Sequence, residues 1–308
     1  NKIVFSEMLP GTRLLVDDGK LRFSVLNVSY ESFIAEALDS GTIKSKKGVN
    51  LPELSFNISP LTNKDKLDLE FILEHKLDYI ALSFVQRSSD ILELRSLIDI
   101  DTKIISKIEK PQALNDISNI IRLSDAVMIA RGDLGVELTP QQVPTIQKKL
   151  IQNCRRVGKP VIVATQMMES MINSPVPTRA EVSDVAQAIY EGADAVMLSA
   201  ESAVGNYPVE AVKTMNSIAT EVEKEKTYRE VIESSRTPLK GDVSDAITVA
   251  AREVAETTNV KVICCFTETG TTASLTSRER PKVPIIALTP KITIARKLTL
   301  NWGLHCII

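Results

Sequence analysis

Two patterns of apolar residues divide the chain. Within residues 1–50, short alternating runs at Leu14–Val16, Leu21–Val28 and Phe33–Ala37 are separated by polar segments that contain glycine. Alternation with a period of two between glycine turns is typical of short strands, so the sequence predicts a small β unit here. From about Thr62 onward, apolar runs of strand length alternate with runs of helical length, which predicts βα units and a parallel sheet.

The second pattern repeats five times before a separate unit begins. The expected strands cover 79–84, 103–108, 126–130, 160–164 and 195–198, and the expected helices cover 64–75, 90–98, 111–123, 144–157, 180–191 and 208–226. Thr178–Glu181 has the capping-box pattern of a helix start, and Gly158 and Gly192 are placed to end helices. After a polar hinge at 233–242, a smaller α/β unit has expected helices at 245–257, 272–280 and 292–302 and strands at 260–266, 284–288 and 305–308.

Five successive βα units fit either an open doubly wound sheet or part of an eight-stranded barrel. Nearly every expected strand ends in polar residues, which are Ser83, Lys107 and Glu109, Arg131 and Asp133, Thr165 and Gln166, and Ser199 and Glu201. A β/α barrel uses the carboxyl ends of all its strands for chemistry, whereas an open sheet uses only those at its switch point. We therefore predict an α/β fold with a partial (β/α)8 barrel at 51–223, a partial β-rich lid domain at 1–50 and an incomplete C-terminal α/β domain at 224–308.

The segment Lys103–Gln112 carries the strongest chemical signal. Lys107 and Glu109 lie two residues apart at the end of an expected strand, so their side chains share a face. The next strand ends near Asp133, and two carboxylates from neighbouring strand ends suit Mg²⁺, with Lys107 beside them to neutralise a phosphoryl group. The alternative is a salt-bridge network at the rim that includes Arg131, and the residue pattern alone leaves both interpretations open.

Weaker signals lie at other strand ends. The glycines of Ala130–Gly135 could expose backbone N–H groups to a carboxylate or phosphate, although such a segment is more often a simple turn. Thr165 and Ser199 bring hydroxyl groups to the same rim, where helix capping is the common alternative. The loop Thr267–Thr272 also suits a phosphate, but the Glu268 carboxylate would repel an anion.

Composition narrows the class of protein. The net charge of −2 gives no case for nucleic-acid binding, and no apolar run reaches the roughly 18–20 residues needed to cross a bilayer. Only two histidines are present, so a histidine-rich zinc site is not expected. The four cysteines, Cys154, Cys264, Cys265 and Cys306, have no metal-binding spacing, and we expect buried, reduced thiols in a reducing cytoplasm.

Several motifs stand in the order and spacing of one family. Ile105–Glu109 resembles the active-site signature of pyruvate kinases, and Val127–Glu137 and Val163–Met171 are similar to further segments of that family. Other segments that match in register are Pro177–Glu181, Asp194–Ser199, Asp17–Gly19 and Ser45–Pro52. The resemblance to the pyruvate kinase family therefore extends over essentially all 308 residues.

The resemblance implies a role for each matching residue. Lys107 would stabilise the transferring phosphoryl group, Glu109 and Asp133 would bind Mg²⁺ (with Mn²⁺ as an alternative), and Thr165 would act in proton transfer at the enolate carbon. The residues implied around the substrate are Ser83, Phe84, Ala130, Arg131, Gly132, Asp133, Thr165 and Ser199, with Asp18 and Lys47 facing them from the lid. The implied effector-phosphate loop contains Thr267, Thr269, Gly270, Thr271 and Thr272. Because of Glu268, we expect weak or no activation by fructose 1,6-bisphosphate.

The implied reaction, the last step of glycolysis, converts phosphoenolpyruvate and ADP into pyruvate and ATP. The resemblance also implies a cytoplasmic enzyme that, at full length, uses K⁺ and forms a homotetramer. The family's first three barrel strands, the first part of its lid and the end of its C-terminal domain have no counterpart here, so we expect a fragment with poor activity by itself. Two alternatives remain: a Mg²⁺-dependent aldolase or lyase, and a truncated relative kept for binding or regulation.

Overall fold

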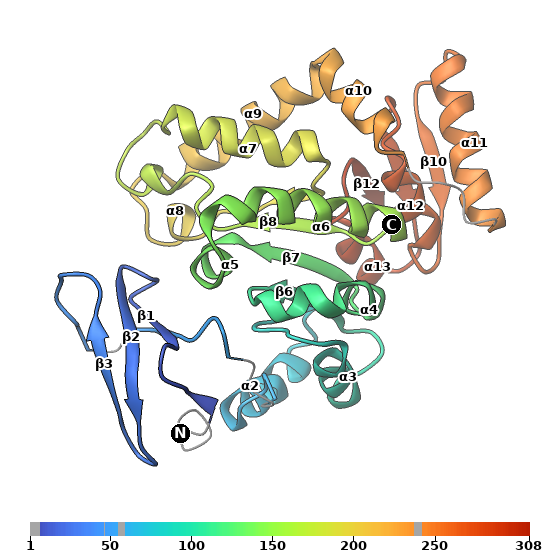
Figure 1. Cartoon of the computed structure of the whole chain (residues 1–308). Helices are drawn as coiled ribbons and strands as arrows, with labels where there is room; N and C mark the ends of the chain where they lie inside the picture. Colours follow the sequence, from blue (N-terminus) through green and yellow to red (C-terminus); the bar gives the residue numbers. More distant parts are fainter. Residues whose placement is uncertain (1–6, 46, 55–58, 237–241) are drawn as a thin grey trace.

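The computed structural model describes residues 7–45, 47–54, 59–236 and 242–308, which form three sheets (Figure 1). The N-terminal sheet is antiparallel and has the strand order β3-β2-β1-β4. Its strands are β1 (Arg13–Val16), β2 (Leu21–Val28), β3 (Phe33–Ala37) and β4 (Val49–Asn50). Asp17, Asp18 and Gly19, in the turn between β1 and β2, have positive φ angles, a conformation that Asp and Gly tolerate better than most residues. The predicted short strands are thus confirmed.

The central sheet contains five parallel strands in the order of the chain. They are β5 (Tyr79–Leu82), β6 (Lys103–Ile108), β7 (Ala126–Ala130), β8 (Val161–Ala164) and β9 (Ala195–Val196). The main helices between and after them are α2 (Asn63–Glu74), α3 (Ser88–Leu97), α4 (Ile117–Leu123), α6 (Val143–Val157), α7 (Arg179–Glu191) and α9 (Pro208–Lys224). Strand order without a reversal is that of a β/α barrel rather than a doubly wound sheet. The described strands form an open segment of such a barrel, with β5 and β9 at its edges.

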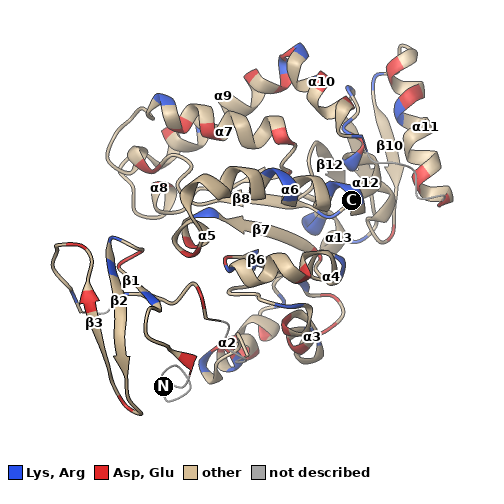
Figure 2. Ribbon diagram, in the orientation of Figure 1, with Lys and Arg blue, Asp and Glu red and all other residues tan. Residues whose placement is uncertain are grey.

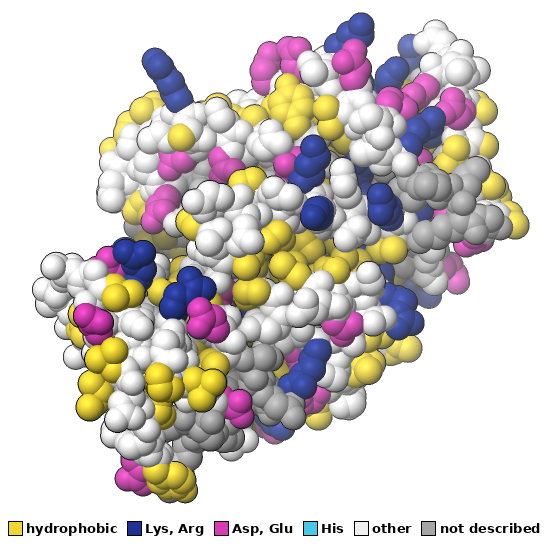
Figure 3. Space-filling view, viewed as in Figure 1, with side chains coloured by type: hydrophobic (Ala, Val, Ile, Leu, Met, Phe, Trp, Pro, Cys, Tyr) yellow, Lys and Arg dark blue, Asp and Glu magenta, His cyan; other side chains and the backbone are white. Residues whose placement is uncertain are grey.

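The two faces of the central sheet differ in what covers them. Ile104, Val127 and Val161 belong to the large core beneath the helices. The neighbouring residues Ile105 and Met128 point to the opposite, inner face, where a smaller cluster forms. Lys107 lies two residues beyond Ile105 and therefore belongs to this inner face. Apolar side chains also gather across the middle of the surface seen in Figure 3, above the central part of the molecule.

The C-terminal unit has its own parallel sheet in the order β10-β11-β12. Its elements are α10 (Lys226–Ser234), α11 (Val243–Thr257), β10 (Ile263–Phe266), α12 (Thr271–Arg278), β11 (Ile285–Leu288), α13 (Ile292–Leu298) and β12 (Leu304–Ile307). This unit packs at the end of the central sheet where the strands begin, whereas the N-terminal sheet lies near the other end (Figure 1). The Tyr79 hydroxyl donates to the Lys297 carbonyl at 2.9 Å, and Arg280 donates to the Gly192 carbonyl at 2.8 Å.

Several expectations need correction. The predicted helix at 208–226 is broken, because Glu225 has an extended conformation between α9 and α10. β9 ends at Val196, two residues before the predicted end. Two short helices that follow strands, α5 (Arg131–Glu137) and α8 (Ala200–Ala203), were not predicted. Cys264 is exposed on β10, because adjacent strand residues face opposite sides, while Cys154 and Cys265 are buried as expected.

The left-handed glycine that ends α7 provides a test of the fold. Gly192 has a φ of 94°, and a Cβ atom there would lie 3.0 Å from Cδ of the buried Arg155. We expect Gly192→Ala to lower the free energy of unfolding by about 2 kcal/mol, measured by urea denaturation. Gly48→Ala is the control, since the described residues, apart from its two chain neighbours, place no atom within 4 Å of its Cβ position. Equal stabilities of the two variants would contradict the role assigned to Gly192.

Candidate active site

Lys107 and Glu109 connect the carboxyl ends of β5 and β6. The Lys107 ammonium lies 2.6 Å from Oε1 of Glu109 and donates to Oγ of Ser83 at 2.9 Å. The other Glu109 oxygen accepts a hydrogen bond from the backbone N–H of Phe84 at 2.7 Å. The Glu109 side chain is only 1% exposed, while that of Lys107 is 25% exposed. The predicted shared face is confirmed, and it holds a buried carboxylate next to a lysine that solvent can reach.

Asp133 stands at the next strand end, in the first turn of α5. Its carboxylate is partly buried and makes no hydrogen bond or ion pair with any residue that the structure describes. Among the described residues, no group of three or more His, Cys, Asp or Glu side chains could hold a metal ion. Mg²⁺ needs only one or two protein carboxylates when substrate oxygens and water complete its shell. An unpaired Asp133 just after β7, the strand that pairs with β6, fits that requirement.

The backbone at the end of β8 is strained. Thr165 has a φ of 72° and Gln166 a φ of 52°. A β-branched residue in the left-handed region is unusual, and such strain concentrates at functional sites. Oγ1 of Thr165 accepts a hydrogen bond from the Gly132 N–H at 2.7 Å and donates to the Ala164 carbonyl at 2.5 Å. Phe84, at the end of β5, also has a positive φ, of 56°.

The Arg131 guanidinium holds this strained turn in place. It donates to the carbonyl of Thr165 at 2.8 Å and pairs with Asp184 of α7 at 2.6 Å. Another contact is made to the sulfur of Met167. The Arg131 side chain is therefore directed to the loop after β8. Its pairing with Asp184 was not indicated by the sequence, because the two residues lie 53 positions apart. The predicted substrate contact of Arg131 remains untested.

Comparison with known proteins decides the family. The family model for the pyruvate kinase barrel domain matches residues 1–212, and the model for the pyruvate kinase alpha/beta domain matches residues 245–308. The chain belongs to the pyruvate kinase family. A pyruvate kinase of Agrobacterium vitis is 51% identical over 300 residues, which are 97% of this chain and 62% of that protein. A pyruvate kinase of Methylorubrum extorquens is 48% identical over 99% of this chain and 64% of its own length.

A solved structure agrees with this family membership. The crystal structure of a pyruvate kinase from Cryptosporidium parvum superposes with a TM-score of 0.94 and 39% sequence identity. The match covers 100% of this chain and 65% of that chain. The present chain thus spans less than two thirds of the length of these relatives. The predicted barrel class with a C-terminal α/β domain is confirmed by these matches.

The N-terminal sheet contacts the pyruvate kinase barrel segment beside Asp133. A Cβ atom at Gly19, in the β1–β2 turn, would lie 3.7 Å from Val136 of α5. The buried Glu137, on the same helix, accepts a hydrogen bond from Asn50 of β4 at 2.7 Å and pairs with Lys110 at 2.5 Å. The sequence analysis missed Glu137 and Lys110 because nothing in the local pattern relates them to Asn50. These contacts place the turn next to the helix that carries Asp133.

The two lid residues singled out from the sequence differ in their contacts. Lys47 pairs with Asp17 at 2.8 Å, and its hydrogen bond holds the pKa of Asp17 below the ordinary value. Asp18 is exposed and makes no hydrogen bond or ion pair within the described part of the chain. Lys47 thus pairs with Asp17 and not with the adjacent Asp18. Whether both side chains face a substrate remains a prediction.

The remaining predicted residues lie at strand-to-helix junctions. Ser199 is exposed and precedes α8, with its N–H donated to the buried Glu201 at 2.7 Å. In the Thr267–Thr272 loop, Oγ1 of Thr267 accepts from the Gly270 N–H at 2.9 Å, and the hydroxyls of Thr269 and Thr271 lie 3.0 Å apart. The exposed Glu268 and Thr272 complete this loop at the start of α12.

Loss of the Arg131 contacts should be measurable. We expect Arg131→Met to lower the free energy of unfolding by about 2 kcal/mol, because it removes charge-assisted hydrogen bonds from the turn at Thr165. Urea denaturation measures this change. Arg156→Met is the matched control, because Arg156 is exposed on α6 and its side chain makes no hydrogen bond or ion pair to a described residue. If both variants unfold alike, Arg131 does not hold the turn.

Proposed function

We propose that this chain carries the phosphoryl-transfer site of an enzyme that converts phosphoenolpyruvate and ADP into pyruvate and ATP. The observation that carries the proposal is the position of Lys107, held between Ser83 and the buried Glu109 on the inner face of the sheet. A fixed ammonium group at that place can neutralise the negative charge on a transferring phosphoryl group. Membership of the pyruvate kinase family supports the same reaction.

The two neighbouring carboxylates fit a divalent metal. Each oxygen of Glu109 uses one hydrogen bond or ion pair and retains a lone pair, and Asp133 has no described partner. Glu109 and Asp133 would hold Mg²⁺, or Mn²⁺ as the alternative, and the metal would supply charge neutralisation on the phosphoryl oxygens. For the full-length enzyme we propose in addition a K⁺ requirement and a homotetramer.

We assign the hydroxyl of Thr165 to the proton-transfer step of the proposed reaction. In this structure it accepts the Gly132 N–H. A substrate carboxylate could take this N–H, with the backbone of Ala130 and Asp133 around it. The Thr165 hydroxyl, which now donates its proton to the Ala164 carbonyl, would have to turn from that carbonyl to protonate the substrate carbon. Gly132 suits such an approach, because a Cβ atom there would stand 3.4 Å from the Thr165 hydroxyl oxygen. Ser83, Phe84, Arg131 and Ser199 would border the same substrate, with Asp18 and Lys47 opposite.

The helices bear on where the proposed enzyme is located in the cell. Both basic and acidic positions occur along the helices (Figure 2). Within the described ranges, no helix is long and apolar enough to cross a membrane. We propose a cytoplasmic location, in keeping with the glycolytic reaction.

The first test concerns Lys107. We expect Lys107→Met to lower ADP-dependent pyruvate formation from phosphoenolpyruvate by roughly 10²–10³-fold, because it removes the charge that stabilises the transferring group. A lactate-dehydrogenase-coupled assay with and without Mg²⁺ measures the rate. Lys149→Gln is the control, since Lys149 is exposed on α6 and its side chain makes no hydrogen bond or ion pair to a described residue. Unchanged turnover in Lys107→Met would contradict the proposed role.

The metal site can be tested separately from turnover. A binding measurement is useful because we expect slow turnover by these 308 residues alone, since the five described strands leave the sheet open. Mn²⁺ binding, followed by electron paramagnetic resonance, should weaken about tenfold or more in Glu109→Gln and in Asp133→Asn, since each variant removes one anionic ligand. Glu210→Gln is a matched control at an exposed position on α9. Equal Mn²⁺ affinity in all four proteins would exclude this pair as the ligands.

A further inference from the structure

A buried carboxylate, that of Glu137, joins the N-terminal sheet to the rim of the central sheet. Its Oε1 atom accepts a hydrogen bond from the Asn50 side-chain amide at 2.7 Å and lies 2.5 Å from the Lys110 ammonium. The Glu137 side chain is 1% exposed, and its other oxygen has no hydrogen-bond partner among the described residues. A carboxylate at this depth depends on the few partners that it has, so loss of either contact should be costly.

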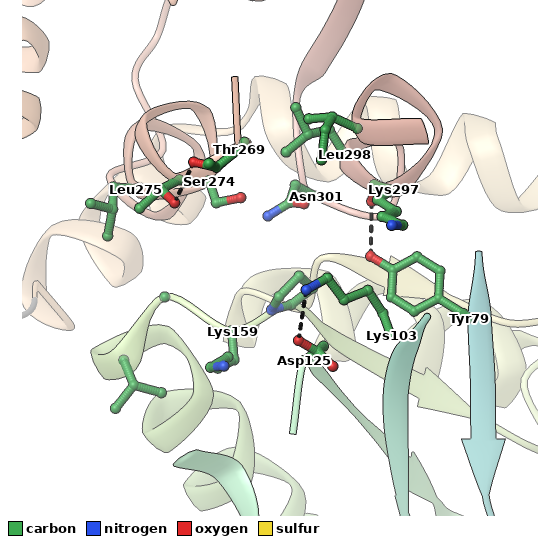
Figure 4. A pocket seen from close by; sticks show the side chains of 16 residues that line it. Tyr79, Lys103, Asp125, Lys159, Thr269, Ser274, Leu275, Lys297, Leu298 and Asn301 are labelled. Atoms are coloured by element: carbon green, nitrogen blue, oxygen red, sulfur yellow. Dashed lines mark hydrogen bonds and ion pairs between the residues drawn. The ribbon is translucent and has the colours of Figure 1, made fainter. Parts of the chain in front are cut away.

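The three residues of this contact come from three separate elements. Asn50 ends β4, Lys110 follows β6, and Glu137 ends α5. Strand β6 begins at Lys103, which lines the cavity beside the C-terminal unit (Figure 4), so Lys110 lies beyond the opposite end of that strand. The contact is therefore at the rim that carries the candidate active site.

A second contact from the segment after β6 holds the next residues of the N-terminal sheet. The Gln112 side-chain amide donates to the carbonyls of Leu54 at 3.3 Å and Pro52 at 3.5 Å. Leu51 and Leu54 pack in the apolar cluster of the N-terminal sheet. The stretch 50–54 is thus bonded to the rim on one side and packed into the N-terminal sheet on the other.

Strand pairing connects Asn50 with the lid residues of the proposed site. β4 pairs with β1, and Asn50 stands opposite Leu15. Just past these paired residues, the Asp17 N–H donates to the Gly48 carbonyl at 3.1 Å, and the Asp17 carboxylate pairs with Lys47. Because hydrogen-bonded strands hold their register, the position of Asn50 at the rim also sets where Lys47 lies.

We propose that Glu137 is a positioning residue that anchors the N-terminal sheet, through Asn50, over the phosphoryl-transfer site. Glu137 and Asp133 are four residues apart on α5, so the anchor and the proposed metal ligand share one face of a short helix. Lys110 supplies the charge that compensates the buried carboxylate. This role rests on the proposed function, because the side chains that the anchor places would face Lys107.

The position of the N-terminal sheet can be measured without turnover. Double electron–electron resonance gives the distance between spin labels at Glu36→Cys in β3 and Lys149→Cys on α6, two exposed positions. Cys264→Ser and Cys306→Ser remove the two cysteines of the chain that are not buried. With the anchor intact, we expect a single distance population from the docked sheet.

Asn50→Asp should release the sheet, because it replaces the donor with a second carboxylate against Glu137. We expect the ratio of displaced to docked sheet to rise about tenfold or more, as for the loss of a charge-assisted hydrogen bond. Addition of Glu137→Gln should restore the single population, because the glutamine amide can then donate to the new carboxylate. Asn27→Asp is the matched control, since it adds the same charge at an exposed position of β2 whose side chain makes no hydrogen bond to a described residue.

Two outcomes would overturn the anchor. The first is an unchanged distance distribution in Asn50→Asp when circular dichroism shows that the variant is folded. The second is a failure of Glu137→Gln to restore the docked population in the double variant, which would leave displacement without the proposed partner.

The lactate-dehydrogenase-coupled assay separates the anchor from the proposed function. If Asn50→Asp displaces the sheet but the unsubstituted protein shows no turnover, the anchor stands and the proposed reaction fails. If turnover is present, a displaced sheet should raise the KM for at least one substrate, and the double variant should reverse that rise. Unchanged KM values for both substrates in a displaced Asn50→Asp variant would contradict the placement of the sheet over the site.

Discussion

The parallel pairing of β5 to β9 in chain order is the constraint on which the candidate site depends. It brings the ends of β5, β6 and β7 to one rim, where the buried Glu109 meets Lys107 and the Phe84 N–H. An uncompensated carboxylate at that depth would cost several kcal/mol, so these partners must be present whenever the rim is folded. The same pairing therefore fixes the conformation after β5 and leaves Lys107 facing the inner side.

Strain at the rim is compatible with a stable fold because neighbouring strands supply the contacts that hold it. The left-handed turn at Thr165 is held by Gly132 from one side and by the Arg131 guanidinium from the other. These two residues follow β7 directly, so one short segment orients the hydroxyl and secures the carbonyl of the same residue. Asp184 fixes Arg131 in turn from α7. The geometry of this turn is thus built from three separate parts of the chain.

The sequence allowed prediction of most elements that depend on local periodicity, although the ends of β9 and α9 were placed two residues too far along the chain. The strands at 103–108 and 126–130 match β6 and β7 residue for residue, and the capping box at Thr178 is present. The pairing of Lys107 with Glu109 followed from strand geometry alone. The Arg131–Asp184 and Asn50–Glu137 contacts could not be predicted, because they join residues 53 and 87 positions apart. Helix α5 was missed because its glycines, read locally, indicate a turn.

Strand β8 connects the strained turn at Thr165 to the contact with the C-terminal unit. At its start, Asp194 accepts the Val161 N–H at 2.9 Å and also pairs with the buried Arg280 of the C-terminal unit at 3.1 Å. At its end stands Thr165, roughly 13 Å away by the rise of four strand residues. β8 is buried along its whole length and bonded to β7 and β9, so it cannot shift independently of the sheet. The contact with Arg280 and the strained turn at Thr165 thus lie at opposite ends of one buried strand.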